Sequence, residues 1–244
     1  MNPFLYPKAR HRRHQSPPSF SDYRRYKPYL QAEFERQCVY CRLPDTMGHD
    51  FGVDHYRPAS RFPEFTCDYA NLYYACNACN RRKGAYWPTR HQDRAGCFVP
   101  NPCDHVMFEH LRYVRAQVQA RSSTGGFTID LLDLNDDDSV LFRELVIDAI
   151  AGFEGERAKL LRLIERLGKL HAARRDRPAI ATRLAARLSE AESRLTTVEQ
   201  HLARLSGQLG VGALTCPGSV ENRKDGVLSQ GMFRIGRRRK GRKQ

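Results

Sequence analysis

Two pairs of cysteines with the same internal spacing are the clearest chemical signal in this 244-residue chain. Cys38 and Cys41 form the first C-x-x-C pair, and Cys76 and Cys79 form the second. Four thiolates in two such pairs can complete a tetrahedral zinc site, which leaves no coordination position open for chemistry. The spacing therefore predicts a structural zinc ion, with disulfides or ordinary core cysteines as the alternative.

Three residues between or directly beside the cysteine pairs could hydrolyse a phosphodiester bond. His55 is the candidate base, because imidazole accepts protons near neutral pH and can activate water. Asp54 and Asn80 offer the oxygen ligands that Mg²⁺ prefers, with water and a substrate phosphate in the remaining positions. Adjacent residues of a regular strand point to opposite faces, so we expect a local irregularity at Asp54 and His55.

The region around these residues resembles the HNH endonuclease family. The ββα-metal motif of that family reads approximately D-H-x-x-P-x-S, then N-L-x-x-x-C-x-x-C-N-x-x-K, and the resemblance covers roughly residues 38–88. The matching residues are Asp54, His55, Pro58, Ser60, Asn71, Leu72, Cys76, Cys79, Asn80 and Lys83. The resemblance implies an endonuclease that hydrolyses DNA with Mg²⁺ or Mn²⁺, in which Asn71 braces the loop that carries His55.

The three basic residues after Asn80 are candidate contacts to the substrate backbone. Arg81, Arg82 and Lys83 begin the helix expected there, although an ordinary solvated helix face is the alternative. DNA is the expected partner, and RNA stays open.

The segment from Phe127 to Arg143 looks like the one that follows the nuclease core in stand-alone prokaryotic HNH proteins. This likeness implies a role in anti-phage defence or restriction, with a non-catalytic DNA-binding or coiled-coil subunit as the alternative.

The charge of the chain agrees with a nucleic-acid partner. Lys and Arg number 41 against 27 Asp and Glu, a net charge of +14. Residues 1–37 carry net +5 and residues 234–244 net +7, whereas residues 128–148 carry net −6, so the two ends are candidate nucleic-acid arms. We see no apolar run that could span a bilayer and no signal peptide, and therefore expect a cytoplasmic protein without a membrane partner.

The order of elements predicts an α+β protein, with a small zinc-stabilised ββα-metal core and a mainly helical C-terminal region. We expect a basic arm and short helix (1–37), a nuclease domain (38–105), a helical or mixed extension (106–153), a helical hairpin or coiled coil (154–210) and a basic disordered tail (211–244). His91, Cys97, Cys103 and His105 could form a second metal site, although their spacing is loose. No other role is assigned to Cys97 or Cys103, and none to Cys67 or Cys216.

Individual elements follow from periodicity and capping. We expect helices at about 23–36, 106–119 and 154–175, a strand at 127–134, and a helix from about Val140 that Asp136 to Ser139 cap. Apolar residues then recur at steps of four and three between residues 184 and 209, as in a coiled-coil seam. Pro178 precedes this seam, which could close a hairpin, form a homodimer or bind a partner protein.

Overall fold

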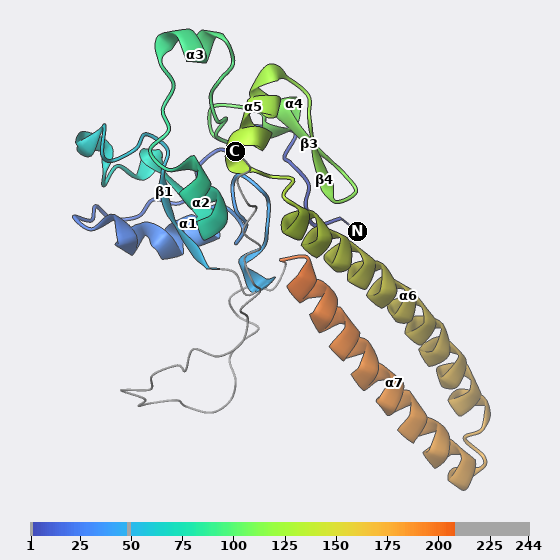
Figure 1. The fold of residues 1–244 in the computed structure, drawn as a ribbon. Coiled ribbons are helices and arrows are strands. Elements are labelled where there is room, and N and C mark those ends of the chain that lie inside the picture. The colour runs from blue at the N-terminus through green and yellow to red at the C-terminus, as the bar shows by residue number, and fades with distance from the viewer. Residues whose placement is uncertain (1, 48–49, 208–244) are drawn as a thin grey trace, which may run out of the picture. The chain divides into compact units, whose positions relative to one another are not determined.

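The predicted α+β class is confirmed by the computed structural model, which describes residues 2–47 and 50–207 (Figure 1). In chain order, the elements are η1 (Tyr23–Tyr26), α1 (Lys27–Glu33), η2 (Asp45–Met47), β1 (Phe51–His55), η3 (Pro63–Phe65), η4 (Tyr69–Asn71), β2 (Leu72–Cys76), α2 (Asn77–Lys83), α3 (Arg90–Arg94), α4 (Met107–His110), β3 (Leu111–Val114), β4 (Gln117–Ala120), α5 (Ser123–Leu132), α6 (Asp137–Ala173) and α7 (Pro178–Leu205).

The centre of the fold is a ββα unit made of β1, β2 and α2. The two strands pair antiparallel in continuous register, from Phe51 opposite Cys76 to His55 opposite Leu72. Every residue of β2 is buried, and α2 follows β2 without a linker. The irregularity expected at Asp54 and His55 is wrong, because β1 stays regular and turns these two side chains to opposite faces.

The N-terminal arm packs against this unit. Phe4 and Tyr6 are buried, and the Tyr6 hydroxyl donates to the carbonyl of Tyr40 at 2.8 Å. Residues 2–20 form no helix or strand, and the short helix expected at about 23–36 is confirmed by η1 and α1 together. The buried rings of Phe4 and Tyr6 therefore hold this segment against the fold, although its basic and proline-rich composition predicts no fixed position for it.

Two elements between the core and the long helices were predicted wrongly. The helix expected at 106–119 is one short helical turn, α4, followed by the hairpin of β3 and β4. The strand expected at 127–134 lies instead largely within α5, whose N-cap Ser122 accepts from the backbone amide of Gly125. At Gly125 a Cβ atom would overlap the carbonyl of His110, so close packing requires this glycine inside the helix.

The C-terminal part of the described chain is a helical hairpin of α6 and α7, which lie side by side in Figure 1. The cap expected before Val140 is confirmed, since Asp136 accepts from the backbone amide of Ser139 at 3.1 Å. One continuous 37-residue helix replaces the two helices expected from Val140 to residue 175. The predicted seam faces this helix, with Ala191 and Val198 buried against Leu160. Leu209 of the seam, Cys216 and the basic tail lie outside the described residues.

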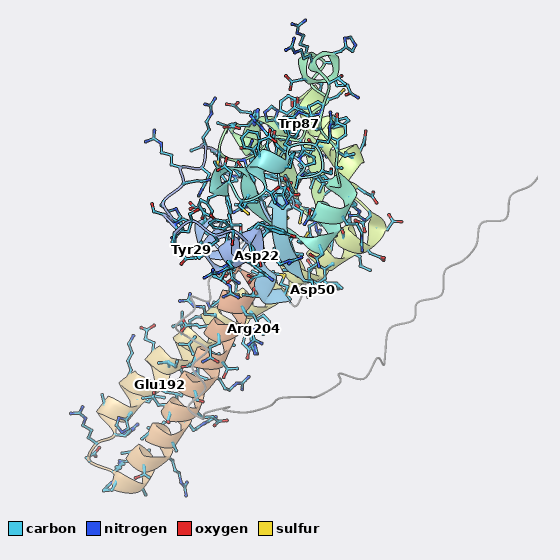
Figure 2. The ribbon with its side chains drawn as sticks, turned by 90° about the vertical axis from the view of Figure 1, so that its left-hand side faces the viewer. Asp22, Tyr29, Asp50, Trp87, Glu192 and Arg204 are labelled. Atoms are coloured by element: carbon cyan, nitrogen blue, oxygen red, sulfur yellow. The ribbon has the colours of Figure 1, made fainter. Side chains whose placement is uncertain are left out.

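Contacts at the start of α6 and at the end of α7 join the base of the hairpin to the N-terminal part of the chain. Phe4 packs with Val146 and Ile150 of α6, and the Thr46 hydroxyl donates to the carbonyl of Arg204 at 2.6 Å. Figure 2 labels Arg204 at this contact and Glu192 farther along the hairpin. Among the described residues, no helix is long and apolar enough to cross a membrane.

Candidate active site and metal cluster

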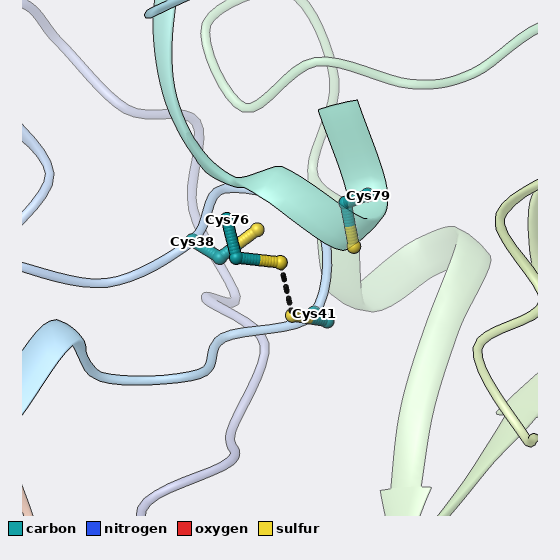
Figure 3. A group of neighbouring side chains, drawn as sticks. All are labelled: Cys38, Cys41, Cys76 and Cys79. Atoms are coloured by element: carbon teal, nitrogen blue, oxygen red, sulfur yellow. Dashed lines mark hydrogen bonds between the residues drawn. The ribbon is translucent and has the colours of Figure 1, made fainter. Parts of the chain in front are cut away.

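The four predicted zinc ligands come together in one buried cluster (Figure 3). The Sγ atoms of Cys38, Cys41, Cys76 and Cys79 all lie within 4.8 Å of one another, and Cys41 and Cys76 are 3.7 Å apart. None of the four forms a disulfide. Hydrogen bonds from the Cys38, Cys41 and Cys79 thiols lower the pKa of Cys76 strongly, which favours a thiolate there. Four converging thiols without an open position fit a structural zinc ion.

The cluster joins the first cysteine turn to the junction of β2 and α2. The backbone carbonyl of Cys38 accepts from the backbone amide of Arg42 at 2.9 Å, which closes the turn. The backbone amide of Val39 donates to the carbonyl of Tyr74 in β2 at 3.0 Å. Cys76 ends β2 and Cys79 lies in the first turn of α2. An ion at this point would fix the direction in which α2 leaves the sheet, and with it the position of Asn80.

His55 lies at the end of β1, with its ring half-exposed on the outer face. Its Nε2 atom is 3.0 Å from the backbone carbonyl of Thr66, and the Tyr23 ring packs edge-on at 4.6 Å between ring centroids. A carbonyl only accepts, so this contact requires the imidazole proton on Nε2 and leaves the lone pair on Nδ1. The ring is therefore held in the tautomer of a base that acts through Nδ1.

Asn71 closes the loop that follows His55. Its side-chain amide donates to the carbonyls of Arg57 and Phe65 at 3.1 and 3.2 Å, and its Oδ1 accepts from the Arg57 amide at 2.8 Å. The side chain is buried, so these bonds are protected from water. Three bonds from one side chain hold both ends of the segment from Arg57 to Phe65, the arrangement that a loop-bracing residue needs.

Asp54 points to the opposite face of β1, into the core. Its Oδ1 accepts from the Lys83 ammonium at 3.0 Å and its Oδ2 from the Tyr40 hydroxyl at 2.6 Å. Burial, and then the neighbouring Asp54 carboxylate, raise the pKa of Tyr40, so its hydroxyl stays protonated and donates. Asp54 is therefore a buried, charge-paired group whose two oxygens both already accept hydrogen bonds.

Lys83 is buried as well, which differs from the surroundings that a surface phosphate contact needs. Besides the pair with Asp54, its ammonium donates to the backbone carbonyl of His55 at 2.7 Å. One cation thus ties the end of α2 to the two residues at the end of β1. Lys83 acts in this fold as an internal support for the strand end that carries His55.

The remaining sequence candidates lie on α2. Asn80 is half-buried, and its side-chain amide donates to the carbonyl of Val53 in β1 at 3.3 Å. Arg81 is exposed, whereas Arg82 donates to the carbonyls of Leu132 and Asp133 and to the Asp136 carboxylate at 3.1 to 3.2 Å. Of the three basic residues, Arg81 is the one with an exposed side chain for a phosphate, while Arg82 joins α2 to the start of α6.

The structure also brings together a cluster that sequence reasoning missed. His11, His14 and Glu33 place ligand atoms within 4.8 Å of one another beside the ββα unit. The H-x-x-H spacing of His11 and His14 was a usable signal, but Glu33 lies 19 residues farther along the chain, in α1. The loosely spaced group of His91, Cys97, Cys103 and His105 does not form such a cluster among the described residues.

Parts of the chain are similar to known proteins. Residues 38–85 match the family model described as HNH endonuclease, which confirms the resemblance for that segment. The chain is also 24% identical to the Septu protein PtuB of Bacillus thuringiensis over 126 residues, which cover 50% of this chain and 47% of that protein. The chain thus spans about half the length of the curated relative it matches. No solved structure matches the chain.

Proposed function

We propose that this protein is a metal-dependent endonuclease that hydrolyses DNA phosphodiester bonds with a water molecule activated by His55. The tautomer of His55 carries this proposal: the carbonyl of Thr66 holds Nε2, and Nδ1 keeps the lone pair that a general base needs. The match of residues 38–85 to the HNH endonuclease family supports the same chemistry.

In the proposed reaction, His55 accepts a proton from the attacking water at Nδ1. The charge that develops on the imidazole is tolerated because Nε2–H already donates to the Thr66 carbonyl, whose dipole stabilises the protonated ring. Asn71 keeps the loop beyond His55 in place through the bonds to Arg57 and Phe65, and Lys83 fixes the strand end from the other side. The base is thus supported by the backbone on both sides.

Asp54 and Asn80 are the residues proposed to hold Mg²⁺ or Mn²⁺, and one carboxylate and one amide fit the ligands these ions prefer. When bound, the ion would neutralise charge on the phosphate and on the leaving oxygen. Asp54 would have to share its carboxylate with Tyr40 and Lys83, which the remaining lone pairs of its two oxygens allow in number. The side-chain amide of Asn80 donates one of its two hydrogens to the carbonyl of Val53, and its Oδ1 atom would be the ligand to the ion.

Zinc at the four cysteines is proposed as structural. The ion would join the first cysteine turn to the start of α2, so Asn80 would keep its place beside β1. Arg81 is the proposed contact to the phosphate backbone, because its side chain is exposed on the same helix. The net charge of +14 supports a polyanionic substrate.

Anti-phage defence or restriction is the proposed biological setting. The likeness to the Septu protein PtuB supports this setting. So does the likeness of Phe127 to Arg143 to the segment that follows the nuclease core in stand-alone prokaryotic HNH proteins. The alternative of a homodimer through the seam has less support, because α6 of the same chain already covers Ala191 and Val198.

A plasmid assay tests the proposed activity. The zinc content of the full chain is measured first. The protein is then mixed, in molar excess over the plasmid, with supercoiled DNA in metal-free buffer, and Mg²⁺ or Mn²⁺ is added. Omitting a chelator from the reaction keeps the zinc in place. We expect nicked or linear DNA only with the added ion. Zinc-loaded protein that binds the plasmid and leaves it supercoiled with both ions would contradict the proposal.

A further inference from the structure

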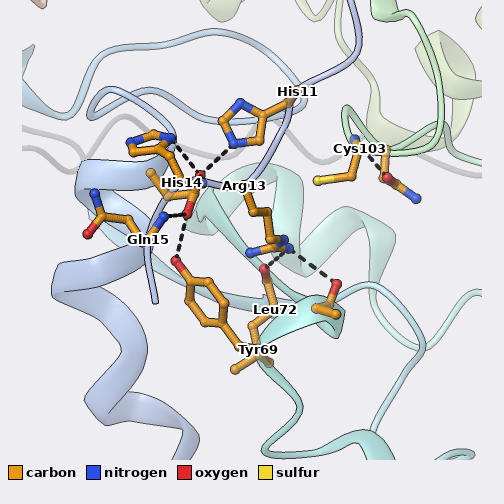
Figure 4. Close-up of polar contacts among 10 residues, drawn as sticks. His11, Arg13, His14, Gln15, Tyr69, Leu72 and Cys103 are labelled. Carbon is orange, nitrogen blue, oxygen red and sulfur yellow. Dashed lines mark hydrogen bonds and ion pairs between the residues drawn. The ribbon is translucent and has the colours of Figure 1, made fainter. Parts of the chain in front are cut away.

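The cluster of His11, His14 and Glu33 lies apart from the residues used above (Figure 4). Glu33 is fully buried in α1, yet its carboxylate faces the N-terminal arm. The Nε2 atom of His11 is 2.7 Å from Glu33 Oε1, and the Nδ1 atom of His14 is 2.9 Å from the same oxygen. Two imidazole nitrogens and one carboxylate oxygen therefore converge on one point.

The second oxygen of Glu33 is held separately. Oε2 accepts from the backbone amide of Gln15 at 2.9 Å and from the Tyr69 hydroxyl at 3.1 Å. Oε1 also accepts from the backbone amide of His14 at 2.9 Å. Bonds from two backbone amides and one hydroxyl hold the carboxylate in one orientation, and Oε1 faces the two histidines, as in supported metal ligands.

We propose that His11, His14 and Glu33 bind a divalent transition-metal ion, with zinc the best match, as a second metal site distinct from the four-cysteine cluster. Two imidazoles and one carboxylate are a ligand set that zinc uses with a fourth position left to water. Ligands on a tetrahedral zinc ion lie about 3.3 Å apart, so the nitrogens would retreat from Oε1 by about half an ångström.

The surroundings favour an ion over hydrogen bonds alone. In the described chain, the only groups within ion-pair distance of Glu33 are these two histidines, so its buried charge has no permanent cation beside it. A divalent ion would supply that charge. The His14 side chain is 55% exposed and Glu33 is 0% exposed, so water and metal can reach the site from the His14 side.

An ion here would fasten the arm to the nuclease unit. Arg13 lies between the two histidines in the sequence. Its guanidinium carbon is 4.8 Å from the ring centroids of both Tyr69 and Tyr73, and its Nη2 donates to the carbonyl of Leu72 at 2.8 Å. Leu72 begins β2 directly after Asn71. The site therefore braces the segment that carries Asn71 and, through it, the loop beyond His55.

Metal stoichiometry of the full chain tests this site without an activity readout. After dialysis against zinc and removal of free ion, we expect about two zinc ions per native chain and about one in the double variant His11→Gln/His14→Gln. His91→Gln, which alters an exposed histidine of α3, is the matched control and should keep both. One ion per native chain, or equal loss in the His91→Gln control, would overturn the proposal.

Cobalt substitution separates the two sites and guards against misfolding. Cobalt bound by four thiolates absorbs strongly in the near ultraviolet, whereas cobalt bound by imidazole and carboxylate does not. We expect the double variant to keep the thiolate bands at native intensity and to lose one equivalent of bound cobalt. If the double variant does not fold, X-ray absorption at the zinc edge of the native chain decides: mixed sulfur and nitrogen or oxygen ligands support the site, and sulfur ligands alone overturn it.

Discussion

Replacing Lys83 by methionine tests whether this residue is an internal support or a surface contact. Methionine keeps most of the apolar stem but removes the ammonium, which leaves the Asp54 carboxylate buried beside Tyr40 alone. At the observed 3.0 Å separation, a pair of unit charges interacts by about 5.5 kcal/mol at an effective dielectric constant of 20. Because both side chains are 2% exposed, water cannot replace the lost partner.

We therefore expect Lys83→Met to cost about 3 to 5 kcal/mol, the usual penalty for breaking a buried pair from one side. For a chain of this size the melting temperature should fall by roughly 10 °C. Thermal unfolding followed by circular dichroism measures this loss, and Arg81→Met on the exposed face of α2 is the control that should change it little. The double variant Lys83→Met/Asp54→Asn should recover part of the loss. A Lys83→Met protein within 1 kcal/mol of native would refute the assignment.

Three further predictions concern the junctions of the fold. Both Asp136→Ala and Asp136→Asn lose the ion pair with Arg82, but only Asp136→Ala also loses the N-cap of α6, so it should cost about 1 kcal/mol more in chemical denaturation, and equal losses would contradict this. Arg143→Met should cost about 3 kcal/mol, because the carbonyls of Ala116 and Leu134 lose a buried donor, and a native melting temperature would contradict it. Burial, and then His105, lower the pKa of His110, so its neutral form stabilises the fold above about pH 6.5 and this contribution is lost as pH falls. His110→Gln should flatten the acid loss of stability just below that pH, and an unchanged pH profile would contradict it.

The ββα unit and the cysteine cluster could be predicted from the sequence because their signals are local. Two C-x-x-C pairs fix which cysteines meet, and a continuous strand pattern leads directly into α2. The irregularity expected at Asp54 and His55 rested on the assumption that both side chains face the substrate. In the structure, His55 lies on the outer face of β1, whereas Asp54 meets Lys83 on the opposite face, in the core.

The β3–β4 hairpin and α5 could not be predicted because their turn and packing signals are absent from the sequence. Arg115 takes a positive φ of 54° in the turn between β3 and β4, where glycine or asparagine would have marked a hairpin. In α5, Gly125 and Gly126 lower helix propensity, and the close approach to His110 that requires Gly125 becomes visible only in three dimensions.

Partners distant in sequence account for what was missed around the site. The meeting of Glu33 with His11 and His14 depends on how the arm crosses α1, which no local pattern encodes. The burial of Lys83 likewise depends on Asp54, 29 residues earlier. Long-range pairs of this kind need the fold before they can be recognised.

The most direct test of the central claim is the single-turnover rate of DNA cleavage by His55→Ala, measured with Mg²⁺ at native zinc content. Loss of a general base ordinarily lowers a rate by about 10² to 10⁴-fold, and we predict a loss in this range. His91→Ala, on the exposed surface of α3, should cleave at the native rate. Cleavage by His55→Ala at the native rate would contradict the account.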